Sequence, residues 1–387
     1  MQHQFTVASF NLENLNSIGT FYEGRDQTPY DAASFDKKAA FVADMLNNIT
    51  APCIIGVQEV FDPQALKDCV ARSSMSTAQI LAPDAKVVTN PTTGNRTATG
   101  PNVGLVTTFP VKSIKTITEF PNEVDIRVPL GADEDMGIVV PIDIRRFERP
   151  VLKAELDVPG LPGLTVLVTH LKSKRPKFLK SESESSPLAQ NLGGLRSLLI
   201  RSCEAAALRS IIRAVRADRA EDGRRRPLIV LGDVNDDISS VTTRMLEGSR
   251  PFARQGAADR YDYARRTADL MLNALELKPP ADGIAYSHVF EGVGTLIDTI
   301  LLSADFLPIE GRQRAEITVT HIKVGHLRNR PLPSVSLPPV NPFGNPEPVK
   351  LKDPLDDIQI DGPRPRKSDG PSVASDHGIP SAVVKVW

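Results

Sequence analysis

Several predicted strands end in polar side chains that could do chemistry together. They are Asn11 in ASFN, Glu59 in IIGVQE, His170 in VLVTH, and Asp233 with Asn235 in IVLGDVN. Carboxylate and amide oxygens are ligands that Mg²⁺ accepts, and imidazole and amide groups can hydrogen-bond a phosphate. If these ends meet, they supply what metal-assisted hydrolysis of a phosphate ester requires. Taken singly, each residue is also explained as a turn former or as the first solvated residue after a strand.

Two further segments add acidic and imidazole groups. Asp298 lies within the apolar run TLIDTILLS, where an unpaired carboxylate is costly, so it must have a partner. Asp376 and His377 are adjacent in SDHG near the C-terminus. Asp376 could also cap a terminus, and His377 could be a surface residue. The order and context of all these residues together form a stronger signal than any one of them.

Short β-branched runs alternate with amphipathic stretches, which is typical of a mixed α and β domain. Strands are predicted at 5–11, 53–59, 102–108, 137–144, 164–170, 227–233, 294–303, 315–324 and 381–387, and helices at 35–48, 63–72, 193–217 and 262–276. In the third helix, one stripe contains Leu195, Leu198, Leu199, Ser202, Ala206 and Ile212. We expect this stripe to face the core.

Composition limits the class of protein. The chain has 387 residues and a formal net charge of -1, from 46 basic and 47 acidic residues, so it cannot hold nucleic acid by an overall positive field. Its three scattered cysteines favour a reducing compartment, and we expect a cytoplasmic protein, or a secreted one if a leader was removed. No stretch reaches the ~18 apolar residues of a transmembrane segment.

A single domain over residues 1–387 is expected, because no break in composition divides the chain. Eleven of the 32 prolines fall between Pro331 and Pro371, which marks 329–372 as a Pro-rich insertion. The insertion ends just before Asp376 and His377. We expect it to overhang the cleft and restrict which substrates enter; the alternative is a disordered insertion.

The motifs together resemble the endonuclease/exonuclease/phosphatase superfamily, the deoxyribonuclease-like metal-dependent phosphoesterases. The resemblance rests on SFNLENL, IIGVQEV, VTHLKSK, GDVN, IDTILLS and SDHGIP, and it runs from about residue 5 to 386. AYSHVFEGVGTLIDTILLS is similar to the bacterial nuclease-like branch. The resemblance implies an α+β fold, a four-layer α/β/β/α sandwich of two packed mixed β-sheets flanked by helices, with the site at the sheet ends. The predicted strands agree with this fold.

The resemblance also implies roles for the residues. Asp233 would orient or deprotonate the attacking water, and Asn235 would hydrogen-bond the phosphate. His170 and His377 would donate to phosphate oxygens, with either one as a candidate base. Asp298 would be the buried partner of His377 and fix its tautomer.

A divalent cation follows from the same resemblance. We expect Mg²⁺, with Mn²⁺ as a possible substitute, held by Asn11, Glu59 and Asp376. Glu13, two residues beyond Asn11, could support the ion through a water.

The substrate is expected to be a phosphate ester, possibly DNA or RNA, that binds to a local basic patch. HLKSKRPKFLK places Lys172, Lys174 and Arg175 directly after His170, and Arg96 and Asn102 flank the segment before NVGLV. We expect these five residues to bind substrate; the alternative for the basic run is a solvated loop.

Three functions stay open. The first is a Mg²⁺-dependent nuclease that cleaves phosphodiesters. The second is a phosphoesterase for lipid head groups or small phosphorylated metabolites, sphingomyelinase-like or inositol-phosphatase-like. The third is a non-catalytic binding scaffold. A monomer is expected.

Overall fold

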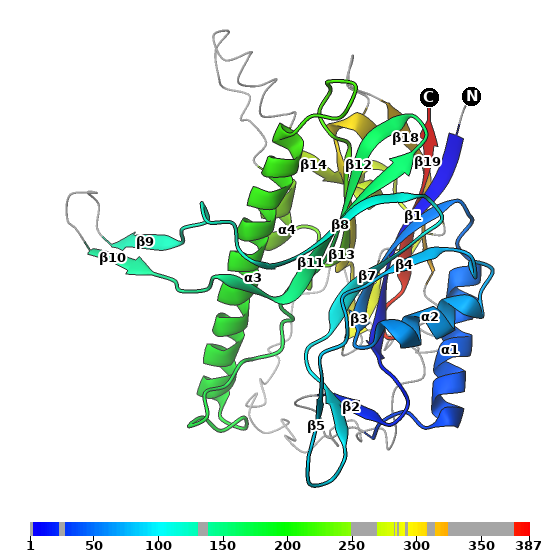
Figure 1. The fold of residues 1–387 in the computed structure, drawn as a ribbon. Coiled ribbons are helices and arrows are strands. Elements are labelled where there is room, and N and C mark those ends of the chain that lie inside the picture. The colour runs from blue at the N-terminus through cyan, green and yellow to red at the C-terminus, as the bar shows by residue number, and fades with distance from the viewer. Residues whose placement is uncertain are drawn as a thin grey trace, which may run out of the picture.

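Two six-stranded β-sheets lie face to face in the middle of the molecule (Figure 1). The computed structural model describes residues 3–22, 28–130, 138–248, 269–281, 283–284, 286–290, 293–307, 314–323 and 375–387. The first sheet has the strand order β18-β19-β1-β3-β7-β4 and the second the order β14-β17-β13-β12-β11-β8. Both are mixed, since β1 pairs with β3, and β12 with β13, in parallel, and their other pairings are antiparallel.

The first sheet is built around β1. Its two central strands are buried on both faces along most of their length. Its strands are β1 (His3–Leu15), β3 (Cys53–Val60), β4 (Gln79–Leu81), β7 (Asn102–Thr107), β18 (Ala315–Lys323) and β19 (Ile379–Val386).

The second sheet is built around β12 and β13. Its strands are β8 (Val111–Glu119), β11 (Arg146–Val158), β12 (Leu161–His170), β13 (Leu228–Asp233), β14 (Met271–Asn273) and β17 (Asp298–Ser303). The two sheets come very close at Gly56 of β3, where an added Cβ would lie 2.7 Å from Leu231 Cβ of β13. A larger residue at 56 would therefore push apart the strands that carry the polar ends.

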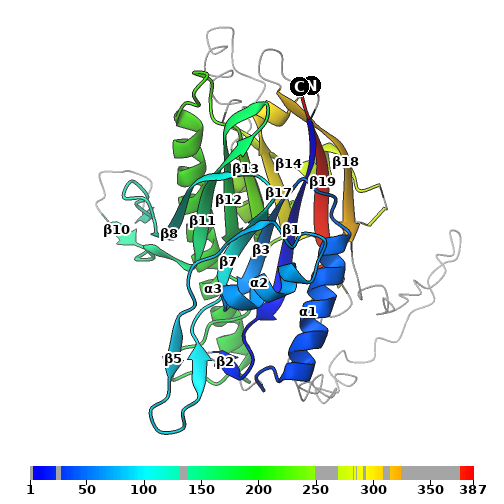
Figure 2. The ribbon, with the colours of Figure 1, turned by 45° about the vertical axis from the view of Figure 1, so that its right-hand side comes forward.

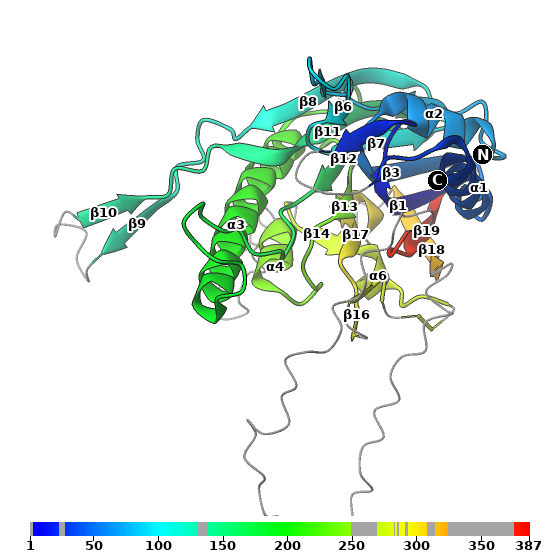
Figure 3. The same ribbon diagram turned by 90° about the horizontal axis from the view of Figure 1, so that it is seen from below.

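Helices cover the outer face of each sheet (Figures 2 and 3). The helices α1 (Ala32–Asn47) and α2 (Pro63–Ala71) share an apolar cluster with the first sheet, and α3 (Pro187–Ala217) and α4 (Val241–Glu247) share another with the second. A third cluster fills the space between the sheets and includes Val7, Leu152, Val166, Ile229 and Val384. The expected four-layer α/β/β/α sandwich is thus confirmed.

Small elements extend from the sandwich. They are the three-stranded sheet β2 (Thr20–Tyr22), β5 (Val87–Thr89) and β6 (Arg96–Ala98); the pair β9 (Arg127–Leu130) and β10 (Ile138–Pro141); the pair β15 (His288–Phe290) and β16 (Val293–Thr295); α6 (Ala274–Leu277); and a 3₁₀ turn at Ala304–Phe306. Among the described residues, no helix is both long and apolar enough to cross a membrane.

Some element predictions were wrong. The run 294–303 is two strands, and Asp298 begins β17 instead of interrupting a strand. The described part of 262–276 starts with the strand β14 before a short helix, and the rest lies outside the described residues. Only 138–141 of the predicted 137–144 strand forms a described strand. The strands β8 and β11 were missed. The Pro-rich insertion 329–372 lies outside the described residues.

The leucine stripe of α3 was also wrongly assigned to the core. Leu195, Leu198 and Leu199 are exposed, by 51%, 44% and 39%. In this half of the helix the polar side chains of Ser197, Arg201 and Glu204, spaced by four and three residues, are buried. Of the predicted stripe, Ile212 does lie in the core. The three polar side chains bind the backbone of the loop after β12, as described below, so the helix turns its polar side inward there.

Candidate active site

The strand register brings three predicted site residues side by side. In the parallel pair β12 and β13, His170 is the partner of Asp233, and in the antiparallel pair β13 and β17, Asp233 is the partner of Asp298. Directly paired residues point to the same face of a sheet. The three side chains therefore form a row at one end of the second sheet, and all three are buried.

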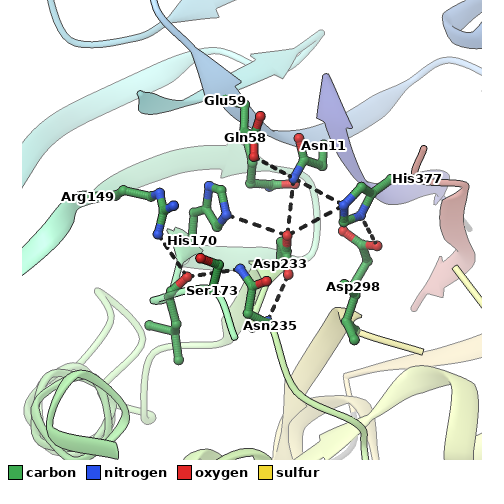
Figure 4. Close-up of polar contacts among 12 residues, drawn as sticks. Asn11, Gln58, Glu59, Arg149, His170, Ser173, Asp233, Asn235, Asp298 and His377 are labelled. Atoms are coloured by element: carbon green, nitrogen blue, oxygen red, sulfur yellow. Dashed lines mark hydrogen bonds and ion pairs between the residues drawn. The ribbon is translucent and has the colours of Figure 1, made fainter. Parts of the chain in front are cut away.

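The first sheet contributes Asn11 and Glu59 from the ends of β1 and β3, where Asn11 pairs in register with Gln58. The Asn11 amide nitrogen donates to Asp233 Oδ2 at 3.1 Å, which joins the two sheets (Figure 4). The same nitrogen lies 3.5 Å from Glu59 Oε1. Residues separated by 222 positions in the chain thus meet where the parallel strands of both sheets end.

The backbone at these strand ends is strained. Among the described residues, the non-glycine residues with positive φ are Glu13, Asn14, Glu59 and Asn235, at 48°, 58°, 59° and 53°. Glu59 and Asn235 are predicted site residues, and the other two follow Asn11. Left-handed backbone at non-glycine positions costs energy and often marks functional sites. The strain therefore points to this site independently of the side chains.

Gly232 sets the approach of β13 to β12. A Cβ at this position would lie 2.0 Å from the Thr169 carbonyl oxygen. Because no side chain fits there, the strand can place Asp233 directly beside His170 only with glycine before it. Glycine is thus required at position 232 because the two strands approach each other closely there, and not because the chain turns.

Asp233 is the centre of the polar network. Its Oδ1 accepts from the Asn235 backbone N–H at 2.8 Å, and its Oδ2 lies 3.5 Å from His170 Nε2 and 3.8 Å from His377 Nε2. Burial raises the pKa of Asp233 to about 7, with His377 acting in the opposite direction. A carboxylate of this basicity can accept a proton from water near neutral pH.

His377 is held by Asp298. Its Nδ1 lies 2.8 Å from Asp298 Oδ2, and its backbone N–H donates to the Ser375 hydroxyl. Burial by itself would lower the pKa of His377, but the carboxylates of Asp298, Asp233 and Asp376 together raise it well above its ordinary value. The carboxylates therefore favour the protonated ring, with Nδ1 donating to Asp298, while Nε2 lies 3.4 Å from the Asn11 amide nitrogen and 3.8 Å from Asp233 Oδ2. Asp298 has the partner that the sequence required.

His170 has a different charge state. Burial, with help from the Arg149 guanidinium, lowers the pKa of His170 well below its ordinary value, so the ring is neutral. Arg149 Nη1 and Asn235 Nδ2 both donate to the Leu171 carbonyl oxygen, at 3.1 and 3.0 Å (Figure 4). The site thus contains one neutral and one cationic histidine on either side of Asp233.

An acidic pocket adjoins Asn11. Glu59 Oε2 accepts from Asn14 N–H at 2.9 Å, and Glu13 Oε2 accepts from Asp376 N–H at 3.1 Å. Behind them, the fully buried Lys38 donates to the Glu13 carbonyl oxygen. Burial lowers the pKa of Lys38 to about 8, against the raising effect of Glu13, Glu59 and Asp376. Three carboxylates against one ammonium leave an excess of negative charge.

The carboxylates of the pocket are the kind of oxygen ligand that Mg²⁺ prefers, but the oxygens of Glu13, Glu59 and Asp376 do not all lie within 4.8 Å of one another. Asn11 differs from the expectation. Its oxygen accepts from Glu13 N–H at 3.0 Å, and its nitrogen faces Asp233. In this orientation Asn11 holds the central carboxylate and does not present its oxygen to the acidic pocket.

The predicted substrate-binding residues are scattered. Lys172 is buried, and its ammonium donates to Ser173 and to the Arg175 carbonyl oxygen of its own loop. Lys174 pairs with Asp236 at 3.3 Å. Arg175 is exposed on the loop, and Arg96 is exposed in the small sheet of β2, β5 and β6. Asn102 is buried opposite Val60, next to Glu59.

The polar stripe of α3 fixes the loop after His170. Glu204 accepts from the backbone N–H groups of Glu148 at 2.8 Å and Lys172 at 2.7 Å, one on each oxygen. Arg201 donates to the Lys172 carbonyl oxygen at 3.2 Å, and Ser197 to that of Arg175 at 2.6 Å. The helix therefore holds the segments that carry His170 and Arg149.

Replacing Glu204 with glutamine should loosen this loop. A glutamine has one acceptor oxygen for two buried N–H donors, so one of them loses its partner, at a cost of about 1–3 kcal/mol. We expect the free energy of unfolding in urea to fall by that amount and catalytic rate to fall with it. The control is E221Q, on an exposed glutamate. Equal stability of both variants would contradict the role of Glu204.

Two residues at the site were missed from the sequence. Arg149 lies on β11, a strand that was not predicted because its pattern is interrupted by charged residues. His288 lies on β15, and its Nε2 is 3.6 Å from Asp376 Oδ2. In the sequence, the imidazole of SHVF is not marked by a strand end or by an acidic neighbour. The position of Asp376 beside it is visible only in three dimensions.

The family model and a matching solved structure carry the same family description. The family model described as Endonuclease/Exonuclease/phosphatase family matches residues 8–318. An endonuclease/exonuclease/phosphatase family protein of Bacteroides thetaiotaomicron matches with 13% identity and a TM-score of 0.47, over 100% of this chain and 96% of that one. Truncated Caenorhabditis elegans TDP2 matches with 12% identity and a TM-score of 0.45, over 99% and 98%. A mannosyl-6-phosphatase of B. thetaiotaomicron matches with 14% identity and a TM-score of 0.41, over 83% and 90%. No curated protein sequence matches significantly.

Proposed function

Because this chain belongs to the endonuclease/exonuclease/phosphatase family, whose members hydrolyse phosphoesters, we propose that it cleaves phosphodiester bonds of nucleic acid with a bound divalent cation. The observation that supports this most is the convergence on Asp233 of Asn11, His170 and His377, next to an acidic pocket. This arrangement places a base, hydrogen-bond donors and cation ligands around one point.

Asp233 is the proposed base. Its pKa near 7 suits removal of a proton from water, and Asn11 holds the accepting oxygen in place. The Asn235 N–H fixes the other oxygen, so the carboxylate cannot rotate freely. Water activated there attacks phosphorus from the side opposite to the leaving oxygen.

The histidines are the proposed donors to phosphate. Asp298 keeps His377 protonated and directs its Nε2 proton toward the reaction centre, where negative charge develops. His170 is neutral and donates through one nitrogen only. Arg149 supplies positive charge beside it without taking up a proton. These groups in one place favour an enzyme over a binding scaffold.

Glu59, with Asp376 and Glu13, would hold the cation, and Mg²⁺ is the proposed ion with Mn²⁺ as a substitute. A bound cation would neutralise charge on the phosphate and on the leaving oxygen. The chain itself fixes Glu59 through the Asn14 N–H and Glu13 through the Asp376 N–H, so the donors are oriented before any ligand arrives.

Replacing Glu59 with glutamine should raise the Mg²⁺ requirement. Loss of the ligand charge is expected to increase the Mg²⁺ concentration for half-maximal rate by about 10- to 100-fold, with a smaller effect at saturation. The measurement is the rate as a function of Mg²⁺ concentration. As a control, E119Q changes an exposed glutamate on β8 and should leave the curve in place. Identical curves for E59Q and the wild type would remove Glu59 from the cation site.

One observation favours a smaller phosphoester as the alternative substrate. The cations expected to attract a polyanion are largely engaged within the protein, since Lys174 pairs with Asp236, Lys177 with Glu148, and Lys172 with its own loop. Lys174, Arg175, Lys177 and Lys180 are all exposed, and of these Arg175 and Lys180 form no ion pair with a described residue. A nuclease should depend on these two, whereas an enzyme for small esters should not.

A substrate panel tests the proposal. Plasmid DNA, single-stranded DNA, RNA, sphingomyelin, bis(p-nitrophenyl) phosphate and sugar phosphates would each be incubated with Mg²⁺, Mn²⁺ or EDTA. We expect nicking of plasmid with Mg²⁺ and none with EDTA, and slower nicking by an R175A/K180A variant. Turnover of monoesters alone would favour the alternative, and cleavage in EDTA would exclude the cation.

A further inference from the structure

His288, Asp376 and His377 form a cluster of a different chemical kind from the acidic pocket. His288 Nε2 lies 3.6 Å from Asp376 Oδ2, and His377 Nε2 lies 3.6 Å from Asp376 Oδ1. The three ligand atoms all lie within 4.8 Å of one another. Ligand atoms of a tetrahedral zinc ion, each ~2.0–2.1 Å from the metal, are about 3.3–3.5 Å apart. The cluster is thus close to the spacing of a zinc site.

The backbone holds both imidazoles in this arrangement. His288 and His377 face each other across an isolated β-bridge, and Gly378 N–H donates to the Ser287 carbonyl oxygen at 2.5 Å. Their ring centroids are 4.7 Å apart. The two ligands come from segments about 90 residues apart in the chain, and this backbone bridge joins them.

Asp298 prepares His377 as a metal ligand. Its carboxylate accepts from Nδ1, which leaves Nε2 as the nitrogen directed at the cluster. Carboxylate partners of this kind orient metal-binding histidines in many proteins and raise their basicity. Two imidazoles and one carboxylate favour zinc and similar transition metals over Mg²⁺.

We infer that His288, Asp376 and His377 bind Zn²⁺, and that zinc there inhibits hydrolysis. The metal would occupy the His377 nitrogen that faces Asp233 and would take Asp376 away from the acidic pocket. His377 could then no longer donate a proton to phosphate. Inhibition rests on the proposed function, whereas zinc binding does not.

Binding is tested without any substrate. The metal-free full chain would be titrated with Zn²⁺ against a chromophoric chelator, alongside His288→Gln and, as a matched control, His321→Gln on the exposed face of β18. We expect H288Q to lose about 100-fold or more in zinc affinity, since it loses a direct ligand. H321Q should bind like the wild type. Equal zinc affinity in H288Q and the wild type would overturn the site.

Two further measurements separate the outcomes. Co²⁺ added to the wild type should give the visible absorption of a tetrahedral ion with imidazole ligands, and the lack of such a band would overturn the site even if H288Q failed to fold. With a hydrolysed substrate and Mg²⁺, zinc should inhibit the wild type and H321Q at much lower concentration than H288Q. Zinc binding without hydrolysis of any ester would contradict the proposed function but not the zinc site.

Discussion

Replacing Asp233 with asparagine is expected to lower kcat by about 10⁴-fold, the upper end of the contribution of a general base. The asparagine amide cannot accept a proton from water. Its nitrogen would also face the amide nitrogen of Asn11, which now donates to Asp233 Oδ2. The loss should appear in single-turnover rates with saturating Mg²⁺, because the chemical step is affected.

Stability should not fall along with the rate in this variant. Burial disfavours the ionised form of Asp233 and raises its pKa to about 7, so a neutral residue of the same shape removes an unfavourable charge. This gain offsets the hydrogen bond from Asn11 that is lost, so we expect D233N to keep the wild-type Tm. The control is D237N, on a nearby residue that caps the Ser239 turn. A drop in Tm matching the loss of rate would indicate disruption instead of a missing base.

The fold and the centre of the site could be predicted because they depend on local pattern. Each functional residue of the parallel strands stands where an apolar run stops, as with His170 and Asp233. Chain direction then places these ends at one edge, and the register sets them opposite each other. Asp298 was identified because a carboxylate next to an apolar strand needs a partner, and His377 is that partner.

The rest could not be predicted because it depends on which side of an element faces the protein. The leucines of α3 follow the expected helical spacing, but the helix turns Ser197, Arg201 and Glu204 inward to bind backbone groups of the loop. The basic run after His170 predicts a substrate surface from its charge alone. In the fold, Lys172 and Lys174 are engaged with neighbouring groups, and these contacts depend on how the loop packs against the rest of the chain.

Replacing Asp298 with asparagine is expected to lower kcat by about 10²-fold, within the range attributed to a well-aligned donor. Asp298 does not reach the reaction centre itself. Asp298 acts through His377. Its carboxylate lies 2.8 Å from His377 Nδ1 and is the largest cause that raises the pKa of His377. Asparagine keeps the shape but loses the charge, so His377 is more often neutral and the Nε2 proton is no longer secured.

A double-mutant cycle distinguishes this positioning role from a structural one. If Asp298 acts through His377, then H377Q alone should be about 10²–10³-fold slower than the wild type, and adding D298N should cost nothing more. If Asp298 only stabilises the sheet end, the two losses of rate should multiply. D298N should then lower Tm equally in the wild type and in H377Q. The register makes the first outcome the expected one, because Asp298 is bonded in the ladder to β13 through its backbone, which the substitution leaves intact. Its carboxylate is therefore available for the imidazole.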